Sequence, residues 1–209
     1  MVIKQKKIGM LLRVSCDKEG IEKASKIISE GGIVVFPPDT VYGIGCDPYN
    51  IESVKKIYQI KSRDISKPLP VLVYSREIAE KIAIFNETAK KIVEKYWPGQ
   101  LTIIVMIKDL ELKKSLNLSN KIALRVPDHQ CTLSLLKKCN FLVGTSANIS
   151  GDGSFTNPED CLKNITDYDI FLDGGVISSK SESTIIEIED EKIKIIRKGS
   201  LSYEELTDI

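Results

Sequence analysis

Apolar runs and amphipathic segments alternate along the chain, and this alternation predicts an α/β fold. Short apolar runs at 33–36, 69–74 and 101–107 are typical of strands buried on both faces. In the segments between them, apolar residues recur every three or four positions, as on the buried side of a helix, and 51–60 is the clearest example. Elements that alternate in this way build a sheet covered by helices.

The same patterns give the order of elements along the whole chain. Helices are predicted at 19–30, 51–60, 76–83, 87–97, 132–138 and 158–163, with Ser75 and Asn86 as N-caps of the third and fourth. Strands are predicted at 8–14, 33–36, 69–74, 101–107, 122–126, 142–144, 170–172, 184–188 and 193–197. Some strands in the second half have only short connections, so we predict a twisted, open, mixed sheet with flanking helices rather than an all-parallel sheet. We expect a single domain over 1–209.

Composition and charge exclude several classes of protein. The chain has 30 Lys and Arg against 29 Asp and Glu, a net charge of +1, which gives no overall bias toward nucleic acid or a membrane surface. No apolar run approaches the ~20 residues of a membrane helix. The apolar stub at the N-terminus is too short for a signal peptide, so we expect a cytoplasmic protein. The five cysteines have no metal-ligand or redox spacing, and we expect reduced thiols.

The segment from Pro37 to Pro48 is the first candidate site. Two prolines end the preceding strand, and the following residues bring Asp39, Thr40 and Tyr42 together with two glycines. Open α/β sheets bind ligands in polar loops at the carboxyl ends of their strands. An ordinary strand-to-helix connection is the alternative at this point.

Three cations close together form the second candidate. Lys61, Arg63 and Lys67 precede a buried strand, and an ammonium beside a guanidinium suits polyphosphate or carboxylate. A solvated basic turn would have the same composition. Arg125, inside an apolar strand, requires an anionic partner, which is either a structural ion pair or a bound ligand.

Two polar clusters follow later strands. Residues 144–151 carry hydroxyls and an amide closed by a glycine, which can present donors to phosphate or form a plain Ser/Asn turn. Ser183 begins another strand, and Arg197 is a late cation. The single histidine, His129, argues against a zinc site or a Ser-His-Asp triad. Gly43 and Gly45 begin a dinucleotide fingerprint, but a proline occupies the third glycine position.

Taken together and in order, these clusters resemble a known family. The segments FPPDTVYGIGCDP, KSR, KPL, WPG with QLT, ALRVP, TSANISG and STI resemble the YrdC-like threonylcarbamoyl-AMP synthases over residues 20–198. The resemblance implies a twisted open α/β sheet with a wide, concave, positively charged face. It also implies synthesis of threonylcarbamoyl-adenylate from L-threonine, bicarbonate and ATP, with release of pyrophosphate. Other enzymes then pass the threonylcarbamoyl group to the adenosine beside the anticodon of tRNA.

The resemblance also implies roles for individual residues. It assigns Lys61, Arg63, Ser146 and Asn148 to the two signature elements at the catalytic site, Thr40, Arg125, Gly144 and Ser183 to threonine, and Arg63, Lys67, Lys121, Ser146, Ser154 and Arg197 to ATP. Mg²⁺ would be carried by the ATP phosphates, with no protein ligands of its own. The reaction needs orientation and cations rather than a protein nucleophile, which fits these residue types.

The chain departs from the family pattern at Pro38, Lys67, Leu72 and Gln100. Pro38 and Leu72 fall near the expected threonine pocket. We also expect no further domain after Arg197. Two other functions stay open: a double-stranded RNA or tRNA-binding module that uses the same concave face, and a divergent relative of the same fold that adenylates another substrate.

Overall fold

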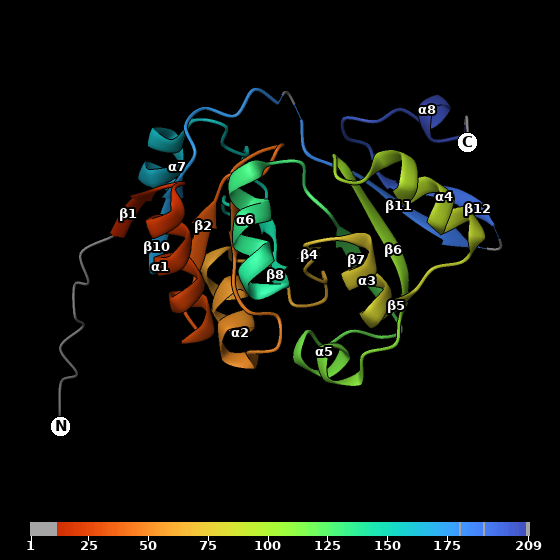
Figure 1. Cartoon of the computed structure of the whole chain (residues 1–209), viewed down its shortest axis with the longest axis horizontal. Coiled ribbons are helices and arrows are strands. Elements are labelled where there is room, and N and C mark those ends of the chain that lie inside the picture. Colours follow the sequence, from red (N-terminus) through yellow and green to blue (C-terminus); the bar gives the residue numbers. More distant parts are fainter. Residues whose placement is uncertain (1–11, 180, 190, 208–209) are drawn as a thin grey trace.

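The computed structural model describes residues 12–179, 181–189 and 191–207, and its strands form two mixed sheets (Figure 1). One sheet has the order β1 (Leu12–Ser15), β10 (Ile170–Asp173), β2 (Val34–Phe36), β3 (Gly43–Gly45) and β9 (Thr145–Ser146). β1, β10 and β2 run parallel, and β3 and β9 are antiparallel to their neighbours. The first predicted strand, 8–14, lies partly outside the described residues.

The second sheet is larger and also mixed. Its order is β12 (Lys192–Arg197), β11 (Thr184–Glu189), β6 (Leu101–Ile107), β7 (Lys121–Arg125), β4 (Val71–Val73) and β8 (Phe141–Val143), with β5 (Ala83–Ile84) paired to the end of β6. β11 is parallel to β6 and β4 is parallel to β7, whereas the other pairs are antiparallel. The predicted mixed α/β architecture is confirmed, but as two sheets rather than one.

Helices cover both sheets. They are α1 (Lys18–Ser29), α2 (Ile51–Ile60), α3 (Arg76–Ile82), α4 (Glu87–Tyr96), α5 (Leu110–Ser115), α6 (Gln130–Cys139), α7 (Pro158–Asn164) and α8 (Tyr203–Thr207). In Figure 1, α1, α2 and α7 lie with the five-stranded sheet on the left, and α3, α4 and α5 lie with the larger sheet on the right. α6 packs against α1 and β8. Within the described residues, no helix is long and apolar enough to cross a membrane.

Local sequence signals explain where the helices begin and end. The side chains of Ser75 and Asn86 accept hydrogen bonds from backbone N–H groups in the first turns of α3 and α4, as predicted for N-caps. Asn50 caps α2 in the same way. Gly31, just beyond α1, has a φ of +84°, a left-handed conformation that glycine adopts without strain.

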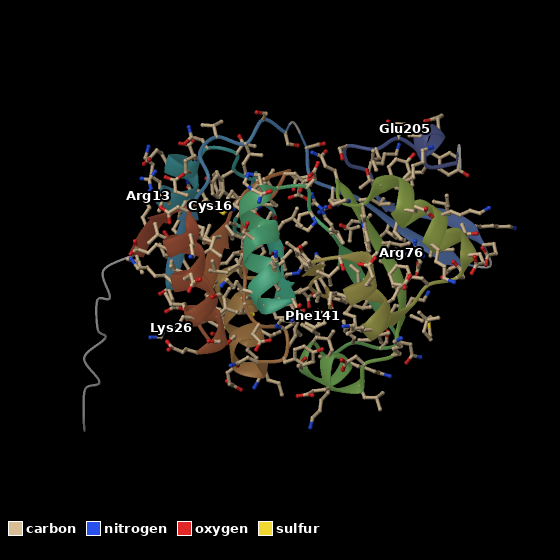
Figure 2. The ribbon with its side chains drawn as sticks, viewed as in Figure 1. Arg13, Cys16, Lys26, Arg76, Phe141 and Glu205 are labelled. Atoms are coloured by element: carbon tan, nitrogen blue, oxygen red, sulfur yellow. A yellow bond between two sulfur atoms is a disulfide. The ribbon has the colours of Figure 1, made fainter. Side chains whose placement is uncertain are left out.

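Two apolar clusters connect the two sheets. The larger contains buried residues from β3, β10, β4 and β6, and the smaller joins β2 and β10 to β4 and β8, so the sheets pack as one body. At the outer edge of the smaller sheet, Arg13 of β1 forms ion pairs with Glu159 of α7 at 2.7 Å and with Asp173 of β10 at 2.6 Å (Figure 2). These exposed pairs connect three elements that are far apart in the sequence.

Several segments differ from the sequence-based expectation, and two of them are 109–120 and 37–48. Residues 109–120, left without a predicted element, contain α5, whose N-cap is Asp109. The segment 37–48, predicted as a loop, contains β3. All three residues of β3 are buried, and a Cβ on Gly45 would lie 1.8 Å from the carbonyl oxygen of Val143. The glycines that permit this close approach also remove the apolar alternation that would have indicated a strand.

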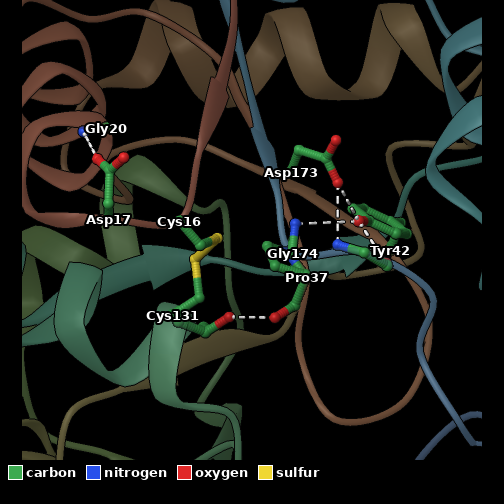
Figure 3. The surroundings of a disulfide bond; sticks show 10 residues. Cys16, Asp17, Gly20, Pro37, Tyr42, Cys131, Asp173 and Gly174 are labelled. Carbon is green, nitrogen blue, oxygen red and sulfur yellow. Dashed lines mark hydrogen bonds between the residues drawn. A yellow bond between two sulfur atoms is a disulfide. The ribbon is translucent and has the colours of Figure 1, made fainter.

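The expectation of five reduced thiols is wrong. Cys16, just after β1, and Cys131, in the first turn of α6, form a disulfide with a Cα–Cα distance of 5.5 Å (Figure 3). The two residues are 115 positions apart, so no local spacing could have indicated the pair. Next to the bridge, the Thr132 hydroxyl donates to the Pro37 carbonyl at 2.7 Å. Cys46, Cys139 and Cys161 are free.

Candidate active site

The candidate site lies where the two sheets meet. β8 belongs to the larger sheet and β9 to the smaller one, and only Gly144 separates them. The Gly144 N–H donates to the Pro70 carbonyl at 3.0 Å, and the Val143 N–H donates to the Cys46 carbonyl at 2.9 Å. A Cβ on Gly144 would lie 2.5 Å from Leu72 Cγ, so a side chain there would push Leu72 aside.

A cleft of about 520 Å³, partly open to solvent, occupies this junction. Residues of β2, β3 and the segment between them, of β4, β6 and β7, and of the β8–β9 and β11–β12 segments line it. Six of the predicted site residues line it: Thr40, Arg125, Gly144, Ser146, Ser183 and Arg197. Pro38 and Leu72, the departures expected near the threonine pocket, line it as well.

Arg125 is the most buried cation of the cleft, with 5% of its surface exposed. Its Nε donates to the Gly99 carbonyl at 2.8 Å, its Nη1 donates to the Thr40 hydroxyl at 3.2 Å, and its Nη2 pairs with Asp39. Burial lowers the pKa of Arg125, and the neighbouring Asp39 carboxylate opposes this effect. The structural ion pair considered in the sequence is therefore present. Three of the five guanidinium N–H groups are used, and two are left for a ligand.

Asp39 provides the anion for this pair, although it was not among the predicted site residues. Its Oδ1 accepts from Arg125, and its Oδ2 is buried without a hydrogen-bond partner. The Asp39 carbonyl accepts from the Gln100 side-chain amide at 2.9 Å. Gln100, one of the departures from the family pattern, therefore holds the same loop in place. The only sequence signal for Asp39 was a carboxylate in a polar loop. No local pattern paired Asp39 with Arg125, because the two residues are 86 positions apart.

Hydroxyl groups and a second arginine also line the cleft. Ser183 is 5% exposed, and its Oγ lies 2.9 Å from the Thr102 hydroxyl. The Arg197 Nη2 donates to the Ser183 carbonyl at 2.8 Å and to the Ser183 Oγ at 3.1 Å. Its Nη1 forms an ion pair with Glu182, another cleft residue that sequence analysis missed.

Lys61 supports the cleft from behind rather than lining it. The side chain is 1% exposed, and its ammonium donates to the carbonyl oxygens of Ser146 and Asn148 and to the Asn148 side chain. Burial is the main reason that the pKa of Lys61 falls to about 8. Asn148 in turn donates to the Asp152 carbonyl at 2.6 Å. Lys61 and Asn148 thus hold the loop that presents Ser146 to the cleft.

The remaining predicted residues differ in how deeply they are buried. Arg63 is half-buried and donates to the carbonyls of Lys67 at 3.0 Å and Pro68 at 3.1 Å. Burial lowers the pKa of Arg63, and the charges of Tyr58, Arg197 and Glu182 also act on it. Arg63 does not line the cleft. Lys67 and Ser154 are exposed and do not line the cleft.

Lys121 does not join the site. It begins β7, four residues before Arg125, which is about 13 Å along a strand. Its ammonium forms ion pairs with Glu187 at 2.5 Å and Glu189 at 2.9 Å, and these carboxylates satisfy its charge. We therefore leave Lys121 out of the nucleotide site that the sequence led us to expect.

Comparison with known proteins covers nearly the same residues as the resemblance found in the sequence. The sequence model of the Sua5/YciO/YrdC family, described as telomere recombination, matches residues 26–199. The chain belongs to the Sua5/YciO/YrdC family. The family resemblance inferred from the sequence is thereby confirmed.

Relatives in the Sua5/YciO/YrdC family carry a common name. A protein of Methanocaldococcus jannaschii, named provisionally as a threonylcarbamoyl-AMP synthase, is 38% identical over 196 residues, which cover 90% of each chain. The threonylcarbamoyl-AMP synthase of Bacillus subtilis is 30% identical over 197 residues, which cover 92% of this chain and 57% of that protein. The chain thus spans most of one relative and less than two thirds of the other.

Solved structures of family members have the same architecture. Pyrococcus abyssi Sua5 in complex with L-threonine matches with a TM-score of 0.87 and 29% identity, over 94% of this chain and 59% of that one. Escherichia coli YciO matches with a TM-score of 0.85 over 95% of this chain and 100% of that one. Its identity is 18%, so it supports the fold alone.

Proposed function

We propose that this protein is a threonylcarbamoyl-AMP synthase, which converts L-threonine, bicarbonate and ATP to threonylcarbamoyl-adenylate, pyrophosphate and water. The observation that carries the proposal is the cleft at the sheet junction, where Arg125 and Thr40 line one wall and Arg197 and Ser183 the other. Family membership and the names of the relatives support the same activity.

Threonine would bind at the Arg125 wall. The two unused N–H groups of the guanidinium can meet a carboxylate, and the planar fork fits both carboxylate oxygens. Asp39 keeps this buried corner neutral before the substrate arrives. The hydroxyls of Thr40 and Ser183 would contact the polar groups of the amino acid, and the structure of P. abyssi Sua5 with L-threonine supports this class of ligand.

ATP would bind along the opposite rim. Arg197 and the Ser146 hydroxyl line the cleft there, and the Arg197 charge acts on Arg63. Lys67 and Ser154 sit on exposed loops, from which they would reach the nucleotide only if those loops move. Lys61 would act by holding the Ser146–Asn148 loop in place. Its buried ammonium already meets carbonyl oxygens, so we give it a positioning role.

The chemistry can proceed by orientation and charge. The threonine amine attacks bicarbonate, water leaves, and a carboxylate oxygen of the resulting carboxythreonine attacks the α-phosphorus of ATP as pyrophosphate departs. Negative charge builds on the phosphates during the second step, and the fixed arginines would stabilise it. Holding both substrates in one cleft would supply the remaining rate enhancement. Because the second step transfers the AMP group of ATP to carboxythreonine, the enzyme would be a nucleotidyltransferase.

Magnesium would enter on the phosphates of ATP and neutralise part of their charge. In the described part of the chain, no group of three or more His, Cys, Asp or Glu side chains is placed to hold a metal ion. This fits an ion bound mainly by phosphate and water, which is how Mg²⁺ commonly binds. The product would pass to separate enzymes that modify the adenosine beside the anticodon of tRNA.

The experiment is a pyrophosphate-release assay with ATP, Mg²⁺, threonine and bicarbonate. Release should require all of the substrates, because the adenylation step has no nucleophile until carboxythreonine forms. Each single omission is the control. Pyrophosphate release that ignores threonine would overturn the proposal and favour a relative that adenylates another substrate.

A further inference from the structure

Glu182 brings a negative charge to the part of the cleft where the cations gather. The side chain lines the cleft and forms an ion pair with Arg197, and both groups are partly exposed, at 30% and 41%. The Glu182 charge also raises the pKa values of Lys61 and Arg63, although burial lowers both overall. One carboxylate therefore pairs with Arg197 and also acts on the charges of Lys61 and Arg63.

The cation beside Glu182 does not depend on it for its position. Arg197 makes three further hydrogen bonds, two to the Ser183 carbonyl at 3.2 and 2.8 Å and one to the Ser183 Oγ at 3.1 Å. Ser183 is itself fixed through the Thr102 hydroxyl at 2.9 Å. If the Glu182 side chain moved away, the guanidinium would remain in place with a free N–H group facing the cleft.

The Glu182 backbone is also fixed, so only its side chain needs to move. Its carbonyl accepts from the Ser200 N–H at 3.2 Å. A Cβ on Gly199 would lie 2.4 Å from the same oxygen, which shows how closely the two backbones approach. A rotation about the side-chain bonds of Glu182 is therefore sufficient to vacate the position between Arg197 and the cleft.

We propose that Glu182 occupies a phosphate position of the nucleotide site and competes with the nucleotide for Arg197. A ligand whose phosphate binds Arg197 must displace the Glu182 carboxylate, and this cost is the same for every such ligand. Removing the carboxylate should therefore raise the affinity for each of these ligands by a similar factor. This inference rests on the proposed function, which makes ATP the nucleotide.

The test is calorimetric binding of three probes without threonine: AMP, inorganic pyrophosphate, and an ATP analogue with a methylene bridge between the α- and β-phosphorus. Wild type is compared with Glu182→Gln, which keeps the shape and removes the charge, and with Glu182→Ala. The matched control is Glu189→Gln, because Glu189 ends β11, the strand that begins just after Glu182, and its partner, Lys121, is outside the cleft.

Both Glu182 variants should bind each of the three probes about threefold to fivefold more tightly, as expected for loss of a partly exposed competing ion pair. The control should stay within about twofold of wild type for every probe. Unchanged or weaker binding of the ATP analogue by both folded variants would overturn the inference and leave the proposed function standing. A wild-type protein that binds none of the probes would overturn the proposed function as well.

Discussion

Arg125 contributes to both folding and the proposed threonine site. It is almost fully buried, and its three partners, the Gly99 carbonyl, the Thr40 hydroxyl and the Asp39 carboxylate, come from two separate loops. A lysine at this position would keep the charge but lose the planar fork. It could not reach all three partners and still offer two parallel donors to a ligand.

Arg125→Lys should therefore raise the threonine concentration at half-saturation by at least about tenfold, and affinity for the ATP analogue should change by less than about twofold. The free energy of unfolding should fall by about 1–3 kcal/mol, because buried acceptors lose donors. Threonine titration of pyrophosphate release and urea unfolding measure the two effects. Arg76→Lys, at a partly buried ion pair outside the cleft, is the control (Figure 2). An unchanged half-saturation point would remove Arg125 from the threonine pocket.

The lowered pKa of Lys61 predicts that nucleotide binding depends on pH. Its ammonium provides three donors for three acceptors, and burial lowers its pKa to about 8. Above that pH the neutral amine has only two donors, so the Ser146–Asn148 loop loses one contact. Affinity for the ATP analogue should therefore decline as the pH rises through about 8, and in Lys61→Met the same titration should show no step.

Stability should respond to pH in the opposite direction. The pKa of Lys61 is lower in the folded protein than in the unfolded chain, so between the two values the unfolded chain binds the proton more tightly. The Lys61 contribution to the free energy of unfolding should thus rise with pH above about 8. Urea unfolding of wild type and Lys61→Met across this range gives the difference. A loss of nucleotide affinity that simply followed a loss of stability would contradict this role.

At the scale of secondary-structure elements, the disulfide fixes the start of α1 to the start of α6. Cys16 is followed directly by Asp17, the N-cap of α1, and Cys131 by Thr132, which holds the strand leading to the cleft. Closing a loop of 115 positions restricts the unfolded chain strongly. The bridge is therefore expected to contribute to stability more than to the chemistry.

Removing the bridge with the double change Cys16→Ser and Cys131→Ser should lower the free energy of unfolding by about 2–4 kcal/mol. Cys139→Ser, which removes a free thiol, is the control. Thiol titration in denaturant without reductant offers an independent check, since three of the five cysteines should react. Five reactive thiols in protein purified without reductant would contradict the bridge.

The elements that could be predicted from the sequence are those with a local cause. β6 has the bounds expected from its apolar run, and α2 those expected from its apolar stripe and the Asn50 cap. β3 was missed because glycines form it, and β9 because it has two residues that pair only with β3. Strand pairing is a long-range property, so the division into two sheets could not be read from periodicity.

The same reasoning separates the predicted from the unpredicted site residues. Hydroxyls and cations that follow strands, such as Thr40 and Ser183, were found because their local setting is unusual. Asp39 and Glu182 were missed because a carboxylate in a polar segment is common, and their importance depends on the distant Arg125 and Arg197. Lys121 was assigned to the site by resemblance, and its two carboxylate partners lie on β11.

At the scale of the whole molecule, the site depends on the junction of the two sheets. Neither sheet contains the cleft alone: Thr40 follows β2 of the smaller sheet, whereas Arg125 and Arg197 end β7 and β12 of the larger one. The net charge of +1 conceals this local arrangement, in which Arg125 and Arg197 each pair with a carboxylate, Asp39 and Glu182. The wide, positively charged concave face expected from the resemblance stays a prediction.

The most direct measurement of the proposed function is detection of the product itself. The protein is incubated with ATP, Mg²⁺, L-threonine and ¹³C-labelled bicarbonate, and the mixture is analysed at once by mass spectrometry. We predict a threonylcarbamoyl-adenylate species that carries the label and disappears when any one substrate is omitted. Pyrophosphate accompanied only by AMP, or an adenylate that lacks the label, would contradict the proposed function.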